Sequence, residues 1–137
     1  MGDPQPDLGA AELEVLRVLW DEGPRTVREV LGALHARGRK VAYTTVLTML
    51  SRLEQKGFVS ARRGGLAHVY RARISRARVT RVRLRSLLDQ LFDGAAGPLV
   101  LELLQSQRLN REEIDELRAL VSRLESQGRS DGRDARG

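Results

Sequence analysis

The sequence predicts a mainly α fold in which three short helices and a β-hairpin are followed by three further helices. Apolar residues recur at spacings of three and four through most of the 137 residues, as in amphipathic helices. One segment, residues 58–71, instead has a β-prone pattern around a Gly-Gly pair. A chain of this length has room for one principal hydrophobic core. We therefore expect a compact domain over residues 8–73, a helical region over 74–126, and flexible tails at 1–7 and 127–137.

The first two helices are marked by their apolar period and by their ends. Residues 10–22 carry Leu13, Leu16 and Trp20 at helical spacing, and Gly23-Pro24 then ends the helix. The next helix begins with a capping box, in which the Thr26 hydroxyl accepts from a free backbone N–H and the Glu29 side chain reaches back to the start of the helix. Its apolar side is formed by Val27, Val30, Leu31 and Leu34, and Gly38 ends it.

The third helix, within residues 41–57, has an unusual composition on one side. Its inner side carries Val46, Leu50 and Leu53, and Gly57 is its expected C-terminal cap. The other side carries three threonines, which are mediocre helix formers, and these are Thr44, Thr45 and Thr48. The threonines are therefore expected to serve something other than helix stability.

The remaining elements are a hairpin and three helices. Two β-prone runs, 58–62 and 67–71, flank a Gly-Gly turn. A long helix follows Ser75 to about Phe92, with arginines in its first half and leucines in its second. A short apolar helix comes next, and Asn110 with Glu113 caps a last helix with a coiled-coil-like apolar repeat.

Charge is distributed unevenly along the chain. Residues 1–23 carry one basic and six acidic residues, residues 24–85 sixteen basic and two acidic, and residues 86–137 seven basic and ten acidic. A basic middle between acidic ends indicates a surface that binds a polyanion such as nucleic acid. The alternative is a solvated arginine-rich surface without such a partner.

Several classes of function find no support in the composition. The chain has no cysteine, which excludes disulfides, thiolate metal sites and thiol nucleophiles. It shows neither a signal peptide nor an apolar segment of membrane-spanning length, so we expect a soluble cytoplasmic protein. No catalytic constellation is present, and His35 and His68 stand alone, so we expect no enzyme, metal site or other cofactor.

Three helices followed by a glycine-turned hairpin is the order of a winged helix-turn-helix, in which the third helix lies in the DNA major groove. Threonine suits the outer side of such a helix, because its hydroxyl can donate or accept and its methyl can pack on thymine. Arg52 falls on the same side as Thr45 and Thr48. The candidate DNA contacts are Thr26, Arg28, Tyr43, Thr44, Thr45, Thr48, Arg52, Arg62 and Arg63.

Each of these contacts has a structural alternative. Thr44 could cap the third helix, with the other threonines as neutral surface, and Thr26 has its own capping role. Arg62 and Arg63 could be plain solvated charges at the hairpin tip. Tyr43 could pack in the core instead of contacting DNA.

The chain resembles the BlaI/MecI/CopY family of penicillinase-type repressors. The likeness covers about residues 8–125 and lies in LGAAELEVLRVLWDEGPRTVREVLGAL, VAYTTVLTMLSRLEQKGFV, HVYRARIS, LLDQLFDG and REEIDELRALV. Members are homodimeric repressors whose winged helix binds an inverted repeat and whose C-terminal helices intertwine. The resemblance implies repression rather than activation, double-stranded operator DNA as the partner, DNA contact by Thr44, Thr45, Thr48 and Arg52, and dimerisation by residues 75–125.

The apolar stripe of the C-terminal region independently favours a homodimer. It is too apolar for three exposed helices, although folding back on the N-terminal domain is an alternative. Twofold symmetry would present two recognition helices to a pseudo-palindromic operator. The residues expected at the dimer interface are Leu84, Leu87, Leu88, Leu91, Phe92, Leu103, Ile114, Leu117 and Val121.

Two features depart from the family pattern. Members that control antibiotic resistance are cut by a membrane sensor-protease at an Asn-Phe pair, and Glu102-Leu103 stands at the matching position here. The resemblance therefore does not carry that cleavage signal over. Copper-responsive members have a C-terminal cysteine cluster, which this chain lacks.

Two other functions fit the same fold. A winged helix can be a protein–protein interaction module, which should expose apolar residues on its third helix; here Leu47 is the one large apolar exception among threonines and Arg52. A DNA-binding protein without sequence preference is the second alternative. Affinity for a palindromic promoter against random DNA at two salt concentrations separates the three.

Overall fold

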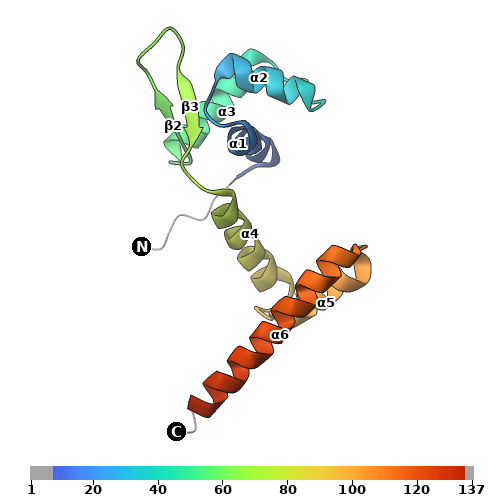
Figure 1. Cartoon of the computed structure of the whole chain (residues 1–137). Helices are drawn as coiled ribbons and strands as arrows, with labels where there is room; N and C mark the ends of the chain where they lie inside the picture. The colour runs from blue at the N-terminus through green and yellow to red at the C-terminus, as the bar shows by residue number, and fades with distance from the viewer. Residues whose placement is uncertain (1–7, 135–137) are drawn as a thin grey trace. The chain divides into compact units, whose positions relative to one another are not determined.

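The structure is a computed structural model that describes residues 8–134. The described chain divides into two compact units, one up to Leu87 and one from Leu88 onward. The first unit contains α1 (Ala10–Glu22), β1 (Arg25–Thr26), α2 (Val27–Ala36), α3 (Tyr43–Gln55), β2 (Val59–Arg62) and β3 (Val69–Ala72). Helix α4 (Arg76–Leu91) begins in this unit and ends in the second, which also holds α5 (Ala96–Ser106) and α6 (Arg111–Asp134) (Figure 1).

The N-terminal unit has the predicted winged-helix order. Its three helices pack against one another, and the β2–β3 hairpin loop projects beyond them (Figure 1). Strands β2 and β3 pair antiparallel, with Val59 opposite Ala72 and Arg62 opposite Val69. The mainly α fold with a small hairpin is confirmed.

Strand β1 was not anticipated from the sequence. Arg25 and Thr26 pair antiparallel with Tyr70 and Val69, which gives the sheet the order β1-β3-β2. A two-residue strand is too short for any alternation of apolar and polar residues, so sequence periodicity carries no signal for it. By pairing with β3, strand β1 joins the start of α2 to the hairpin.

The core of the N-terminal unit is built from one side of each helix. Val46, Leu50 and Leu53 of α3 are completely buried, as predicted, together with Leu16 of α1 and Val30 of α2. The hairpin adds Val59 and Tyr70, and the Trp20 indole N–H donates to the Ile74 carbonyl at 2.8 Å. The first half of α4 joins the same core through Val79, which is why the first unit extends past residue 73.

Two glycines end α2 and α3 in the same way. Gly38 and Gly57 have φ of 85° and 81°, the left-handed region that glycine adopts without a Cβ clash. The amides of Arg39 and Phe58 donate back to the Leu34 and Leu53 carbonyls at 2.9 Å, which is the Schellman pattern. These turns set where α3 begins and where the hairpin leaves it.

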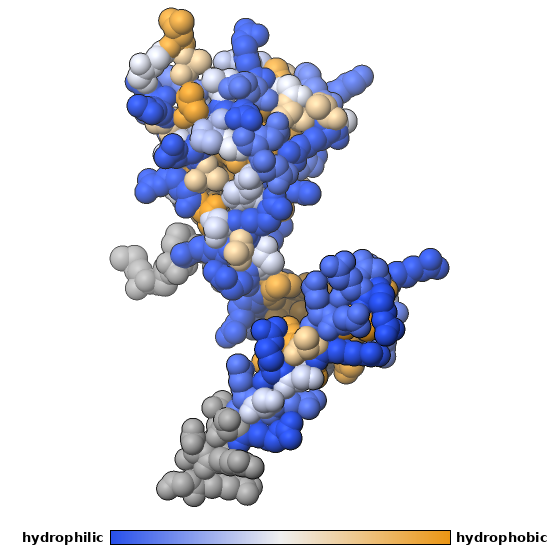
Figure 2. Space-filling model, viewed as in Figure 1, coloured by the Kyte–Doolittle hydropathy of each residue, from blue (hydrophilic) through white to orange (hydrophobic). Residues whose placement is uncertain are grey.

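In the C-terminal unit, no described residue is buried. The predicted cap of α6 is present, with the Glu113 amide donating to Asn110 Oδ1 at 2.8 Å and the Asn110 amide donating to Glu113 Oε1 at 3.1 Å. Figure 2 shows apolar side chains at the surface of this unit, around the position of α5 in Figure 1.

Helix α6 extends farther than the sequence predicted. Residues 127–134, expected to belong to a flexible tail, continue the helix to Asp134. Adding a residue to an existing helix gains a hydrogen bond without a new nucleation cost, and no proline interrupts the segment. Arg129 also pairs with Glu125 one turn earlier, at 4.0 Å. Residues 1–7 and 135–137 of the predicted tails lie outside the described residues.

Among residues 8–134, no helix is both long enough and apolar enough to cross a membrane.

The complete burial of Leu50 predicts a large loss of stability on truncation. Leu50→Ala should lower the free energy of unfolding by about 2–5 kcal/mol, because it removes apolar contacts and leaves a cavity. Urea unfolding followed by Trp20 fluorescence measures this. Thr45→Ala, an exposed change on the same helix, should stay within about 0.5 kcal/mol. Equal effects of the two changes would show that the inner side of α3 is misassigned.

Candidate nucleic-acid interface

The burial of one side of α3 determines which side chains face outward. With Val46, Leu50 and Leu53 buried, the opposite side of the helix is exposed and carries Thr44, Thr45, Thr48 and Arg52. We call these four residues the recognition face. Thr44 and Thr45 lie in the first turn of α3 and Thr48 in the second. The structure thus brings the predicted α3 contacts together on one uncovered surface.

The capping alternative for Thr44 is wrong. The N-cap of α3 is Ala42, which makes no side-chain capping bond, and Thr44 lies inside the helix. The Thr48 hydroxyl donates to the Thr44 carbonyl at 2.9 Å. Because this bond uses the hydroxyl proton, Thr48 Oγ1 can form a further hydrogen bond only as an acceptor.

Arg28 and Tyr43 join the start of α2 to the start of α3. The Arg28 guanidinium carbon lies 5.7 Å from the centre of the Tyr43 ring, within the range of a cation–π contact. Tyr43 is 42% exposed, so the core-packing alternative does not describe it. Both side chains lie at the surface beside the recognition face.

Thr26 performs the capping role that the sequence predicted. Its hydroxyl accepts from the Glu29 amide at 3.2 Å, and its own amide donates to Glu29 Oε1 at 3.0 Å. The bond from the Thr26 amide lowers the pKa of the Glu29 carboxyl below its ordinary value. Thr26 remains half-exposed, so the cap leaves part of its surface available.

The two hairpin arginines differ in whether they form an ion pair. Arg63 Nη2 pairs with Glu54 Oε1 of α3 at 2.7 Å, whereas Arg62 is exposed and has no partner among the described residues. The Arg63–Glu54 pair joins the hairpin to the last turns of α3. Arg63 is therefore not a plain solvated charge, because it has an ion-pair partner. For Arg62 the alternative of a plain solvated charge remains open.

A groove lies between the start of α2, the outer side of α3 and the hairpin. Its volume is about 420 Å³, and it brings together Thr26, Arg28 and Tyr43 from the sequence prediction. Leu47, Leu66 and His68 also line it. Leu66 and His68 were not among the predicted contacts, because only the fold of the hairpin brings residues 66–68 beside α3.

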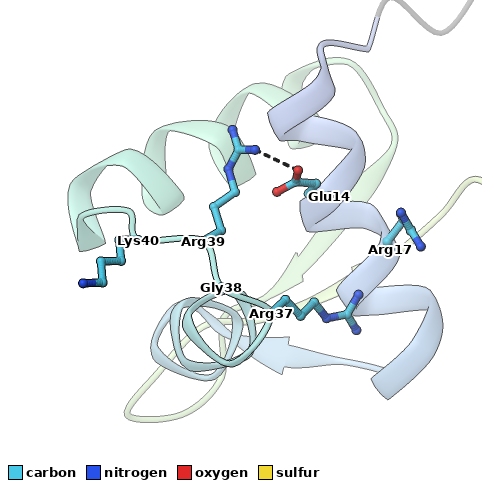
Figure 3. A pocket seen from close by; sticks show the side chains of 6 residues that line it. All are labelled: Glu14, Arg17, Arg37, Gly38, Arg39 and Lys40. Carbon is cyan, nitrogen blue, oxygen red and sulfur yellow. Dashed lines mark hydrogen bonds and ion pairs between the residues drawn. The ribbon is translucent and has the colours of Figure 1, made fainter.

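A basic recess lies beside the connection from α2 to α3 (Figure 3). Its volume is about 580 Å³, and it is lined by Glu14, Arg17, Arg37, Gly38, Arg39 and Lys40. Arg39 points to Glu14 and pairs with it at 2.7 Å, whereas Lys40 points away (Figure 3). Arg37 pairs with Asp21 at 3.2 Å. The recess is thus explained by ion pairs that hold this connection against α1.

The start of α4 is held against α1 by charge as well as by burial. Arg76 forms an ion pair with Asp21, and its guanidinium carbon lies 5.5 Å from the Trp20 ring centre. The hydrogen bond from Arg76 lowers the pKa of the Asp21 carboxyl. Burial raises the pKa of the Tyr70 phenol in the core. These perturbed groups are accounted for by the fold, and within residues 8–134 no group of three metal-ligating side chains occurs.

The predicted dimerisation residues lie on surface that the single chain leaves open. Leu91, Leu103 and Val121 are 69%, 48% and 51% exposed. A groove of about 790 Å³ runs between α5 and α6, and it is lined by apolar residues that include Leu103 and Leu117. The other predicted members are exposed or half-buried, and these are Leu84, Leu87, Leu88, Phe92 and Ile114.

Comparison with known proteins assigns the family. The family model for the penicillinase repressor matches residues 8–123, which is most of the chain. The chain belongs to the penicillinase repressor family.

Two relatives align with most of the chain, and one solved domain aligns with its N-terminal part. The penicillinase repressor of Bacillus licheniformis is 32% identical over 112 residues, covering 82% of this chain and 87% of that protein. The transcriptional regulator BlaI of Mycobacterium tuberculosis is 36% identical over 120 residues, covering 87% and 86%. The solution structure of the DNA-binding domain of the repressor BlaI aligns with a TM-score of 0.48 at 30% identity, over 56% of this chain and 92% of that one.

The capping box predicts a pH-dependent contribution to stability. The folded-state pKa of Glu29 is lowered, so its stabilisation is present above the unfolded-state pKa of about 4.3 and is lost as the pH falls through the folded value. Glu29→Gln should therefore lower the melting temperature at pH 7, and the difference from wild type should shrink below about pH 4. Circular dichroism melts measure it.

Glu116→Gln is the control for the change in net charge, because Glu116 makes no hydrogen bond or ion pair within the described residues. A difference between Glu29→Gln and wild type that stays constant from pH 7 to pH 3 would contradict the assigned stabilisation of the Glu29 carboxylate by the Thr26 cap.

Proposed function

We propose that the chain is a sequence-specific DNA-binding transcriptional repressor that works as a homodimer in the cytoplasm. Its family consists of penicillinase repressors, and two relatives that span most of the chain are named as a repressor and a transcriptional regulator. The observation that carries the proposal is the exposed recognition face of α3, within a segment of sixteen basic and two acidic residues. We assign DNA binding to residues 8–73 and dimerisation to 74–126.

The recognition face supplies hydrogen-bonding groups suited to base edges in the major groove. Thr48 Oγ1 is free to accept, so its expected partner is a donor, the amino group of adenine or cytosine. Arg52 lies one turn further along and can bind guanine or a phosphate. Thr44 and Thr45, in the first turn, complete the surface that enters the groove.

The residues around the recognition face are proposed to position the duplex. Thr26 and Arg28 at the start of α2 and the hairpin arginines Arg62 and Arg63 would contact phosphates, which fix orientation without carrying sequence information. Tyr43, held by Arg28, borders the same surface. This division of roles predicts that changes in α3 alter sequence preference and changes in the hairpin weaken binding to all sequences.

Dimerisation is proposed because the C-terminal unit cannot bury its own apolar residues. Exposed leucines cluster there, while its described part contains no buried residue. Burying a leucine stabilises by roughly 1.5–3 kcal/mol, so pairing two such surfaces is favourable. Twofold symmetry then predicts a pseudo-palindromic operator whose half-site centres lie about one helical turn, or a multiple, apart.

Release of the repressor through the family's sensor-protease is not part of the proposed function. The family's sensor-protease pair is replaced by Glu102-Leu103, which lies within α5. A protein–protein interaction module remains the second candidate, because Tyr43 and Leu47 give the outer side of α3 some exposed apolar surface. The DNA-binding experiment below distinguishes the two.

Substitutions on the recognition face should weaken specific binding. Arg52→Ala should cost about 1–3 kcal/mol, or roughly 5- to 150-fold in Kd, on a duplex selected by the wild-type protein from random sequences. Thr48→Val, which keeps the shape but removes the acceptor, should cost about 1 kcal/mol. Binding is measured against selected and random duplexes at two salt concentrations.

Arg17→Ala is the matched control, since Arg17 is exposed on α1, is not part of the recognition face, and its loss changes the net charge equally. It should leave the preference for the selected duplex unchanged. If Arg52→Ala and Thr48→Val bind that duplex as wild type does, the recognition face is misplaced. If wild type selects no sequence, the protein is a non-specific binder or a protein-interaction module.

Charged substitutions in the apolar stripe should separate the dimer. The double change Leu87→Asp with Leu91→Asp should raise the dimer dissociation constant by about a hundredfold or more, because two leucines of each protomer leave the interface. Sedimentation equilibrium over a dilution series measures it. Leu66→Asp, at a fully exposed position in the hairpin, should leave the dimer intact. Unchanged association of the double variant would place the interface elsewhere.

A further inference from the structure

The groove beside α3 exposes apolar side chains where the proposed interface meets DNA. Leu47 is 38% and Tyr43 42% exposed, and Leu66 at the hairpin tip is fully exposed. All three line the same groove of about 420 Å³. A single exposed apolar residue is ordinary, but three around one groove form an apolar surface that requires an explanation.

Leu47 belongs geometrically to the surface that is proposed to enter the major groove. It lies three residues after Thr44 and four after Tyr43, so these side chains are neighbours along one edge of α3. Thr48, which follows it, is on the recognition face. Arg28 lines the same groove and carries a positive charge suited to an adjacent phosphate. The apolar surface is therefore continuous with the basic, hydroxyl-rich surface.

The chemistry of duplex DNA limits what Leu47 can meet there. The major-groove edges of the bases carry hydrogen-bond donors and acceptors, and their one apolar group is the C5-methyl of thymine. A leucine against a polar edge would leave that edge without its water and without a partner, which is unfavourable. Against a thymine methyl, the same leucine buries apolar surface on both sides.

We propose that Leu47 is a specificity-determining residue that packs on the C5-methyl group of a thymine in each operator half-site. Tyr43 borders this contact from the preceding turn of α3. The inference rests on the proposed DNA-binding function and adds to it a base identity that the threonines and Arg52 do not supply. The recognition face reads polar groups, and Leu47 reads one methyl group next to them.

The test removes the methyl group and nothing else. Operator duplexes are selected from random sequences with the wild-type protein, and each thymine of one half-site is then replaced in turn by 2′-deoxyuridine, which pairs identically but lacks the methyl. At one position the replacement should weaken wild-type binding about fourfold, the value of one buried methyl. If no replacement weakens binding, the proposal is wrong, and this arm needs no protein variant.

A double-mutant cycle then connects that methyl to Leu47. Leu47→Ala should bind the thymine duplex about fourfold or more weakly than wild type does and should no longer distinguish thymine from deoxyuridine at the sensitive position. Leu66→Ala is the matched control, because Leu66 lines the groove from the hairpin; it should keep the full sensitivity. If Leu47→Ala keeps that sensitivity, the methyl is read by another residue and the proposal fails.

These outcomes are distinct from a failure of the proposed function. If the wild-type protein selects no sequence, sequence-specific DNA recognition is refuted, and the proposal for Leu47 is refuted with it. If it selects a sequence but tolerates deoxyuridine everywhere, DNA recognition stands and only the role of Leu47 is refuted. Circular dichroism of Leu47→Ala verifies that the exposed substitution leaves the helices intact.

Discussion

The burial of Val46, Leu50 and Leu53 is the constraint on which the rest of the site depends. A helix that inserts one side completely into a core has only one side left for other contacts, and its rotation about its own axis is fixed. In α3 that remaining side carries threonines and an arginine. The same packing that stabilises the N-terminal unit therefore selects the side chains that are available to a partner.

The local signals in the sequence were sufficient for most of the N-terminal unit. The capping box at Thr26 and the glycines at positions 38 and 57 act through the backbone of a few neighbouring residues, so they can be identified without knowledge of the fold. The apolar period of the helices is equally local. Strand β1 was missed because its partner, β3, lies more than forty residues later and only the folded chain brings the two together. The extension of α6 was missed because glycine-containing polar sequence carries no apolar period.

The candidate site was predictable as a list of residues but not as a set of interactions. Spacing placed Thr44, Thr45, Thr48 and Arg52 on one side of a helix, since helical geometry alone decides that. It could not show that Thr48 donates to the Thr44 carbonyl, or that Arg28 lies over the Tyr43 ring. These contacts depend on rotamers and on the packing of α2 beside α3. The groove between α3 and the hairpin is likewise a property of the tertiary fold.

The pair between Arg63 and Glu54 has a consequence for how binding would begin. It connects a glycine-containing loop to α3, a helix whose position is fixed by the core. A loop restrained before encounter loses less conformational freedom on docking, which lowers the entropic cost of association. In the proposed DNA complex, the Glu54 carboxylate would compete with a DNA phosphate for the Arg63 guanidinium and so weaken binding that does not depend on sequence. A single ion pair thus restrains the conformation of the hairpin and offsets part of its positive charge.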